Sequence, residues 1–328
     1  ILSHGVAEAN PTTVRIMQDM HHDHRNGQPV VTPIPSVSPA KISVEEGTLQ
    51  LRKLCKNTET AMGSFGWSGE LLRHIRQLRT ADDKDNIMVQ LGRLSKMIGM
   101  GDIPKASAFI LTFGRLTALN KLPEQQQKER IHGGQDPKLR PINKGSFLAK
   151  PGLRSAARSA SARRTVKTLE SHGQVGLGQR NGVANTAMAY GAAYRGGYSI
   201  VTTDVNNGFN RLGRQPMVDS VGEPHLWPEG SKVFNLFYGQ DAACILLWWD
   251  PTGKLHVQVI LSKEGTRMGC ILASFGFDMA MDQVYTRMQK EYPEMVFRAA
   301  TDDMPVLVPP KPPEQTWNEW WSRIREMV

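Results

Sequence analysis

Cysteine is scarce in this chain, and its three examples, Cys55, Cys244 and Cys270, lie far apart in the sequence. Their spacing excludes a Cys-x-x-Cys metal knuckle, and their odd number argues against a framework of disulfides. This use of cysteine indicates a reducing compartment, nuclear or cytoplasmic, and a protein that is not secreted.

Long apolar runs are also missing. No run reaches the ~18 apolar residues of a membrane-spanning helix, so a membrane partner is not expected. No basic and then apolar signal segment opens the chain, and its first residue is Ile1 rather than Met. We interpret the sequence as a fragment or a processed piece of a longer protein.

Acidic residues are in the minority, with 31 Asp and Glu against 40 Lys and Arg, which gives a net charge of +9. A basic chain favours polyanionic partners, above all nucleic acid. The 328 residues are 40% apolar, which is enough for about two domains with buried cores.

The segment that ends at Asp204 has the period of a β-strand. Ile200, Thr202 and Asp204 alternate along it and therefore share one face. Glycine and asparagine then break the pattern at Gly208 and Asn210, as turn residues do.

A second acidic site, Asp302 and Asp303, lies inside an apolar run from Met295 to Val308, and this placement predicts the turn of a hairpin. An acid at the end of one strand and a pair at a hairpin turn can hold two divalent cations. Two such cations clamp the attacking and leaving oxygens of a phosphoryl transfer.

These segments resemble motifs A, B and C of reverse transcriptases, with motif A closest to the non-LTR retroelement type. That motif commonly reads Asp-x-x-Asn-Ala-Phe-Asn, and here it reads Asp204-Val-Asn-Asn-Gly-Phe-Asn210. Residues 262–277 resemble motif B, and residues 300–303 resemble motif C. The resemblance covers roughly residues 60–310 in the order of the family.

The resemblance implies an α+β fold, a right-hand polymerase core in which an antiparallel palm sheet packs on helices. We expect residues 1–60 to form a helical extension with a Pro-rich linker, residues 61–197 the fingers and residues 198–328 the palm, ending before the thumb. Within the range expected as fingers, an apolar stripe predicts one buried face of a helix at Ile87, Leu91, Leu94 and Ile98.

The resemblance also implies the catalytic residues, namely Asp204, Asp302 and Asp303. They would hold two Mg²⁺ ions, which Mn²⁺ can replace, with the carbonyl oxygen of Val205 as a further metal ligand. Magnesium prefers oxygen ligands in octahedral geometry. The implied reaction is RNA-directed DNA synthesis, and its partners are an RNA template, a DNA or RNA primer and dNTPs. The sequence leaves the oligomeric state open.

Three cations are candidates for nucleotide binding, in the order Arg140, Lys121 and Lys138. The strand predicted over residues 111–121 and the segment around Arg140-Pro141-Ile142 resemble the fingers hairpin of the family. A triphosphate needs positive charge opposite the metals, and the Arg fork contacts two phosphate oxygens at once. For Lys121 and Lys138, a solvated strand end is the open alternative.

Three further residues complete the predicted nucleotide site: Phe209, Glu264 and Gly265. In the family the position of Phe209 lies under the nucleotide sugar, where a ring crowds the 2′-hydroxyl, so Phe209 points to deoxynucleotides. Gly265 and Gly269 would let the backbone approach a base pair closely. Glu264 replaces the usual Gln, and its charge would repel a triphosphate unless Lys263 or Arg267 pairs with it.

Four arginines, Arg154, Arg158, Arg163 and Arg164, are predicted to bind nucleic acid along the phosphate backbone. Arg154 and Arg158 are four residues apart, the spacing of one helix face. A solvated helix face is the alternative interpretation.

Two other functions stay open at this point. One is a polymerase-derived scaffold that binds nucleic acid without catalysis, and the unusual residue Glu264 is the reason to consider it. The other is an RNA-directed RNA polymerase. Pro305 cannot donate a ladder hydrogen bond, so we expect it at an edge strand or a bulge.

Overall fold

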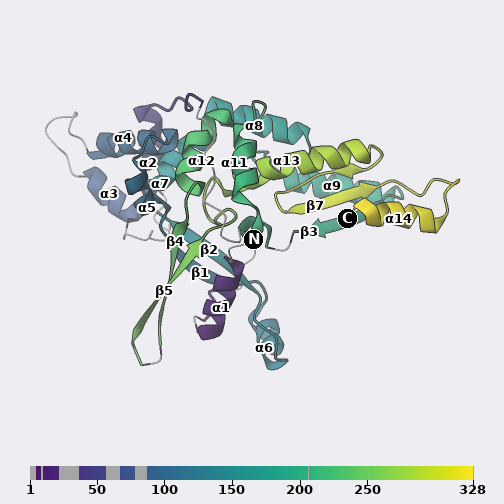
Figure 1. Ribbon diagram of the computed structural model, residues 1–328, viewed down its shortest axis with the longest axis horizontal. Coiled ribbons are helices and arrows are strands. Elements are labelled where there is room, and N and C mark those ends of the chain that lie inside the picture. Colours follow the sequence, from purple (N-terminus) through teal and green to yellow (C-terminus); the bar gives the residue numbers. More distant parts are fainter. Residues whose placement is uncertain are drawn as a thin grey trace.

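The structure is a computed structural model (Figure 1). It describes residues 5–8, 10–21, 37–56, 67–77, 87–205, 207–250 and 252–327, but not the side chains of Asp204, Trp317, Trp321 and Met327. Most of the expected Pro-rich linker, from Pro29 to Pro35, lies outside these residues.

A mixed sheet of four strands forms one part of the described chain. In spatial order its strands are β2 (Leu139–Gly145), β1 (Gly114–Asn120), β4 (Ala242–Trp249) and β5 (Leu255–Ser262). β1 is antiparallel to β2 and parallel to β4, and β4 is antiparallel to β5. The sheet therefore combines strands from the range expected as fingers with strands from the range expected as palm.

Helices define the borders of this sheet. The strand predicted from Leu111 begins only at Gly114, because α5 (Lys105–Thr112) precedes it. Helix α1 (Pro11–Met20) packs Ile16 and Met17 against one sheet face. Asn10 caps that helix by accepting a hydrogen bond from the backbone N–H of Thr13 at 2.9 Å.

The second sheet carries the acidic turn, Ala300–Asp303. In spatial order it consists of β3 (Ser199–Asp204), β7 (Asp303–Val308) and β6 (Val296–Phe297), all antiparallel. Helices α9 (Gly182–Arg195), α13 (Ala273–Glu291) and α14 (Trp317–Met327) lie around it in Figure 1. The sequence Thr316-x-x-Glu319 predicts a capping box at the start of α14, and the structure confirms it: Thr316 N donates to Glu319 Oε2 (2.8 Å), and Glu319 N donates to Thr316 Oγ1 (3.3 Å).

The prediction for Pro305 is wrong, because β7 is the central strand and Pro305 pairs with Thr202 of β3. The Pro305 carbonyl accepts hydrogen bonds from Arg298 N (3.4 Å) and Tyr190 Oη (3.2 Å). In an antiparallel strand, the N–H and C=O of one residue face the same neighbour. The missing N–H of Pro305 therefore faces β6, whose two-residue ladder has already ended.

Four helices pack together: α2 (Val44–Lys56), from the range expected as the N-terminal extension, and α3 (Gly69–Gln77), α4 (Ile87–Met100) and α7 (Ala149–Ala157), from the range expected as the fingers. The stripe predicted on α4 is only partly correct, since Ile98 is fully buried but Ile87 is 38% exposed. Gly92 is buried instead, because α2 comes so close that a Cβ on Gly47 would lie 2.6 Å from the Gly92 carbonyl oxygen. Close packing at small residues thus shifts the buried face.

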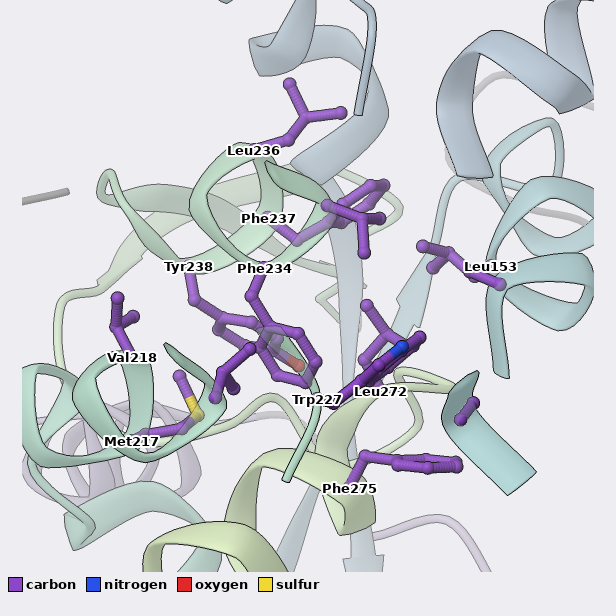
Figure 2. Packing of buried hydrophobic residues seen from close by; sticks show 14 of the residues in the cluster. Leu153, Met217, Val218, Trp227, Phe234, Leu236, Phe237, Tyr238, Leu272 and Phe275 are labelled. Atoms are coloured by element: carbon purple, nitrogen blue, oxygen red, sulfur yellow. The ribbon is translucent and has the colours of Figure 1, made fainter. Parts of the chain in front are cut away.

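A large apolar core surrounds Trp227, which is fully buried (Figure 2). The Trp227 ring lies 5.8 Å from Phe234 and 5.3 Å from Phe275 between ring centroids. Its Nε1 donates to Ser161 Oγ at 3.1 Å. The elements of this region are α8 (Ala160–Ser171), α11 (Arg214–Gly222), η2 (Pro228–Gly230), α12 (Ser231–Tyr238) and α13.

The predicted α+β class is confirmed by these two sheets and their helices, which also include α6 (Glu124–His132) and α10 (Gly208–Arg211). None of the helices among the described residues is long and apolar enough to cross a lipid bilayer.

We predict that Trp227→Ala lowers the free energy of unfolding by about 3–5 kcal/mol, because it removes a buried indole and leaves a cavity. Urea unfolding measures the change. The matched control is Trp249→Ala, since Trp249 is 68% exposed and its loss should cost less than about 1 kcal/mol. Equal losses in the two variants would show that Trp227 is not central to the core.

Candidate active site

The register of β3 and β7 brings two acidic positions together. Asp204 and Asp303 are direct Cα partners at the end of this antiparallel ladder, although they are 99 residues apart in the chain (303 − 204). Directly opposite residues in such a ladder point to the same face of the sheet. The pairing of β3 with the hairpin therefore places the first acid beside the acidic turn.

The acidic turn has an unusual backbone that other elements hold in place. Thr301 has φ of +65°, a left-handed conformation that costs a residue with a side chain about 1–3 kcal/mol. Tyr285 Oη of α13 donates to the Thr301 carbonyl (3.1 Å), and the Thr301 N–H donates to Gln174 Oε1 (3.4 Å). Both partners are buried, at 3% and 1% exposure, so they fix the turn from beneath.

The backbone of the loop that carries Gln174 also supports the chain just before this turn. Val175 N donates to the Ala299 carbonyl (2.7 Å), and Ala299 N donates to the Gly173 carbonyl (2.9 Å), which forms a short parallel bridge. A Cβ on Gly176 would lie 3.0 Å from Cα of Ala300. Only a small residue therefore lets this loop lie so close to the acidic turn.

An open hollow of about 1130 Å³ lies in front of the acidic turn. Asp302 and Asp303 line it on one side, and the two cations Lys121 and Arg140 line it from the four-stranded sheet. Its other lining residues are Pro141, Val205, Asn207, Gly208, Phe209, Met268, Gly269, Cys270, Ala273 and Ser274. Acidic and cationic side chains that lie far apart in the sequence therefore line the same hollow.

The cationic side of the hollow is built by the β1–β2 hairpin. Arg140 is the register partner of Leu119, and the Lys121 N–H donates to the Lys138 carbonyl at 2.9 Å. Arg140 Nε is buried and has no hydrogen-bond partner among the described residues. A buried donor of this kind suits an anionic ligand. Lys138 is exposed and is not a lining residue of the hollow.

Phe209 lies in the hollow on the short helix α10, and its ring packs 5.2 Å from the Phe277 ring of α13. Asn207, with φ of +56°, begins that helix. Gly265, with φ of +63°, approaches it so closely that a Cβ would lie 2.2 Å from the Phe209 carbonyl oxygen. The glycine is therefore needed for contact between two parts of the chain, a reason that the sequence analysis did not give.

Glu264 lies outside the hollow in the described structure. It is 7% exposed, and its Oε2 accepts a hydrogen bond from the Arg214 N–H at 3.4 Å. The Arg214 side chain is also buried and donates to carbonyl oxygens of Gly265 (3.0 Å) and Ser262 (2.8 Å). Arg214 is therefore a positively charged neighbour of this segment that the sequence did not indicate.

A further acid, Asp278 of α13, lies beneath the hollow. It is completely buried, and neither of its carboxyl oxygens has a hydrogen-bond partner among the described residues. Burial raises the pKa of Asp278 well above its usual range, and the charge of Asp302 raises it further. Burial, and then the charges of Asp278 and Asp302, raise the pKa of Tyr285 as well. These side chains thus form one acidic cluster.

This acidic cluster fits a hard divalent cation, because its donors are carboxylate oxygens and an added positive charge would offset their repulsion. Among the described residues, no three His, Cys, Asp or Glu side chains are grouped so that they could hold a metal ion. The side chain of Asp204 is outside that set.

The four arginines predicted to bind nucleic acid do not form one stripe. Arg154 lies on α7 and Arg158 is the residue at which that helix ends; burial, and then the nearby charge of Arg158, lower the pKa of Arg154. Arg158 Nη1 donates to Gln50 Oε1 (3.2 Å). Arg163 and Arg164 lie on α8, where Arg164 forms an ion pair with Glu229 (2.7 Å).

In sequence, the chain is similar to the "Retrotransposable element SLACS 132 kDa protein" of Trypanosoma brucei gambiense, with 26% identity over 254 residues. The match covers 76% of this chain but only 19% of the relative. No protein-family model matches the chain.

Two solved telomerase structures are similar in shape. Apo telomerase from Candida tropicalis, truncated from its C-terminal domain, has a TM-score of 0.39 and 12% identity, over 72% of this chain and 51% of that one. Telomerase from Candida albicans with the TWJ fragment of telomeric RNA has a TM-score of 0.40 and 13% identity, over 69% and 41%. Both TM-scores are below 0.5, so neither likeness bears on the function of this chain.

Sequence reasoning missed Gln174, Tyr285, Asp278 and Arg214. Asp278 had a usable signal, because it is a charged residue between Phe277 and Met279 in an otherwise apolar stretch. The others act through contacts with distant segments, and no local pattern marks such contacts.

We predict that Asp278→Asn makes the metal-free protein more stable at neutral pH. Unfolded Asp278 ionises above about pH 4, whereas the folded protein keeps this proton up to a raised pKa. The stability that the bound proton gives is therefore lost as pH rises through that interval, by about 1.4 kcal/mol per pH unit. Urea unfolding between about pH 5 and pH 8, in the presence of a chelator, measures the trend.

Asp250→Asn is a control for which the effect on stability should change with pH in the opposite direction. A hydrogen bond from the Thr252 side chain, and then one from His256, hold the pKa of Asp250 well below its usual range. The stability that ionised Asp250 contributes is present at neutral pH and is lost in acid. The free energy of unfolding of this variant should therefore approach that of the wild type as pH falls. If Asp278→Asn followed the same trend as Asp250→Asn, Asp278 would not be a buried neutral acid.

Proposed function

We propose that this chain carries the nucleotidyl-transfer centre of an RNA-directed DNA polymerase of a retroelement. The observation that supports it best is the hollow, in which Asp302 and Asp303 face Lys121 and Arg140. Acids on one side and cations on the other match the needs of a metal-bound nucleoside triphosphate. The similarity to a retrotransposon protein agrees with this proposal.

In this proposal, Asp204, Asp302 and Asp303 hold two Mg²⁺ ions, with the Val205 carbonyl as a further ligand. Bound there, the ions would lower the pKa of the primer 3′-hydroxyl and stabilise the departing pyrophosphate. Tyr285 and Gln174 keep the acidic turn in its left-handed conformation, so that the carboxylates are positioned before substrate binds.

The cations have a separate task in this mechanism. Arg140 and Lys121 offset the negative charge of the triphosphate from the side opposite the acids. The Arg140 guanidinium can contact two phosphate oxygens at once, whereas Lys121 supplies a single ammonium. Lys138 supports Lys121 through its backbone, and we assign it no contact with the nucleotide.

Phe209 supports the choice of deoxynucleotides. Phe209 lines the same hollow as the cations and the acidic turn, and its ring packs against Phe277. A fixed ring at this place would crowd the 2′-hydroxyl of a ribonucleotide. A scaffold without catalysis is not favoured, because the unusual Glu264 is buried beside Arg214 rather than exposed to a triphosphate.

The first test is primer extension by the purified chain, with dNTPs or rNTPs, on RNA and DNA templates. We predict that Asp204→Asn, Asp302→Asn and Asp303→Asn each lower product formation at least about 1000-fold, equivalent to ~4 kcal/mol of transition-state stabilisation. The control is Asp219→Asn, at an exposed position of α11, which should extend primers like the unsubstituted chain. Product that survives the loss of Asp204 contradicts the proposal.

The second test concerns the sugar. We predict that Phe209→Val raises the use of rNTPs relative to dNTPs at least about tenfold, because the smaller side chain leaves room for the 2′-hydroxyl. The ratio of the two kcat/KM values measures it. Phe109→Val, at a 54% exposed position of α5, should leave the ratio unchanged. An unsubstituted chain that uses both nucleotides equally would favour an RNA-directed RNA polymerase.

A further inference from the structure

A groove lies along the second half of α13, where two hollows of about 670 and 560 Å³ meet. His172, Thr286 and Lys290 line both hollows, so the two form one surface feature. The first also contains His225 and Arg287, and the second contains Ser171 and Arg298. We call this feature the α8–α13 groove.

A buried acid fixes the floor of the groove. The Asp282 side chain is 3% exposed, with Oδ1 at 2.9 Å from His172 Nδ1 and Oδ2 at 3.7 Å from His225 Nε2. The two rings come from the end of α8 and from the segment after α11. Asp282 therefore anchors both histidines at the surface while its own charge is kept away from solvent.

The walls of the groove are cationic and have no acidic partners. Arg287, Lys290 and Arg298 form no ion pair with a carboxylate among the described residues. Arg298 is oriented by a hydrogen bond from Nη1 to the Phe297 carbonyl (2.8 Å). Three cations that form no ion pair among the described residues, together with the hydroxyls of Ser171 and Thr286, suit a ligand with repeated anionic oxygens.

The groove is separate from the candidate active site. Ser274, at the start of α13, lines the hollow with the acidic turn, whereas Lys290 is 16 residues further along the same helix. At ~1.5 Å per residue, the two positions are about 24 Å apart along the helix axis. The two sites are therefore far enough apart to be tested independently.

The groove continues onto an exposed basic face of α8. Arg163, Lys167 and Ser171 follow one another at intervals of four residues, the spacing of one helix face, and all three are exposed. Figure 1 shows α8 and α13 near each other on the side of the molecule opposite the β4–β5 hairpin. The cations thus extend as a path along α8 into the groove.

We propose that the α8–α13 groove is a second nucleic-acid site, which binds the phosphodiester backbone of a single strand outside the catalytic cleft. The described residues that line the groove include no Phe, Tyr or Trp on which a base could stack, so its cations and hydroxyls would contact the backbone and would not read sequence. The site does not depend on the proposed polymerase activity, and a chain inactive in primer extension could still bind a strand there.

The test compares Arg287→Gln/Lys290→Gln with a matched control, Arg52→Gln/Lys53→Gln, whose two cations are exposed on α2. Both double variants lower the net charge by the same amount. Fluorescence anisotropy with a labelled single-stranded RNA, and with a DNA of the same length, gives the affinity at several salt concentrations. Primer extension on a short duplex is measured alongside, as is the thermal unfolding of each variant.

We expect the groove variant to bind either strand roughly fivefold more weakly at moderate salt. The slope of log K against log salt should fall by about 1.4, since each lost phosphate contact on a single strand removes ~0.7. The control should keep the slope, and primer extension on the short duplex should be unchanged in both variants. Equal slopes in the groove variant and the control would overturn the proposal.

A second measurement uses the unsubstituted chain and does not depend on how the variants fold. Bound RNA should protect Lys290 from acetylation, read by mass spectrometry, and should leave Lys53 reactive. The proposal fails if Lys290 reacts equally with and without RNA. It also fails if polyglutamate protects Lys290 as well as RNA does at equal charge, because the groove would then accept an acidic peptide.

Discussion

The pairing of β3 with β7 is the constraint on which the rest of this structure depends. It sets Asp204 opposite Asp303 and so joins two segments that are 99 residues apart (303 − 204). Register matters because a slip of one residue turns every side chain of a strand to the other face. The ladder is secured by the core beneath it, where Val306 and Val308 are fully buried.

Bringing acids together in this way has an electrostatic cost, which is visible in the raised pKa of Asp278. Asp278 is buried without a hydrogen-bond partner among the described residues, and the charge of Asp302 helps to raise its pKa. Thr301 adds backbone strain, which Tyr285 and Gln174 counter. A left-handed non-glycine residue and a strongly raised pKa at one place are more common at functional sites than at structural turns. A divalent cation would offset the repulsion, which links the geometry to the proposed chemistry.

Local patterns predicted much of this arrangement. Alternation found β3, and the capping box found the start of α14, because both depend on residues close in the chain. The predicted roles of Glu264 and Lys138 are not supported by their positions, since burial beside Arg214 and exposure outside the hollow are tertiary facts. Pro305 was misplaced for the same reason: whether its missing N–H matters depends on the shortness of β6, a separate strand at Val296–Phe297.

The most direct test of the central claim is a disulfide cross-link across the β3–β7 ladder. In a variant without the native cysteines, Val201→Cys and Val306→Cys should form a disulfide rapidly under mild oxidation, because the two residues are Cα partners and opposite positions lie within ~4.5–5.5 Å. The pair Val201→Cys and Leu307→Cys should not form one, since these side chains point to opposite faces. The reverse result would show that the register differs by one residue and that Asp204 does not lie opposite Asp303.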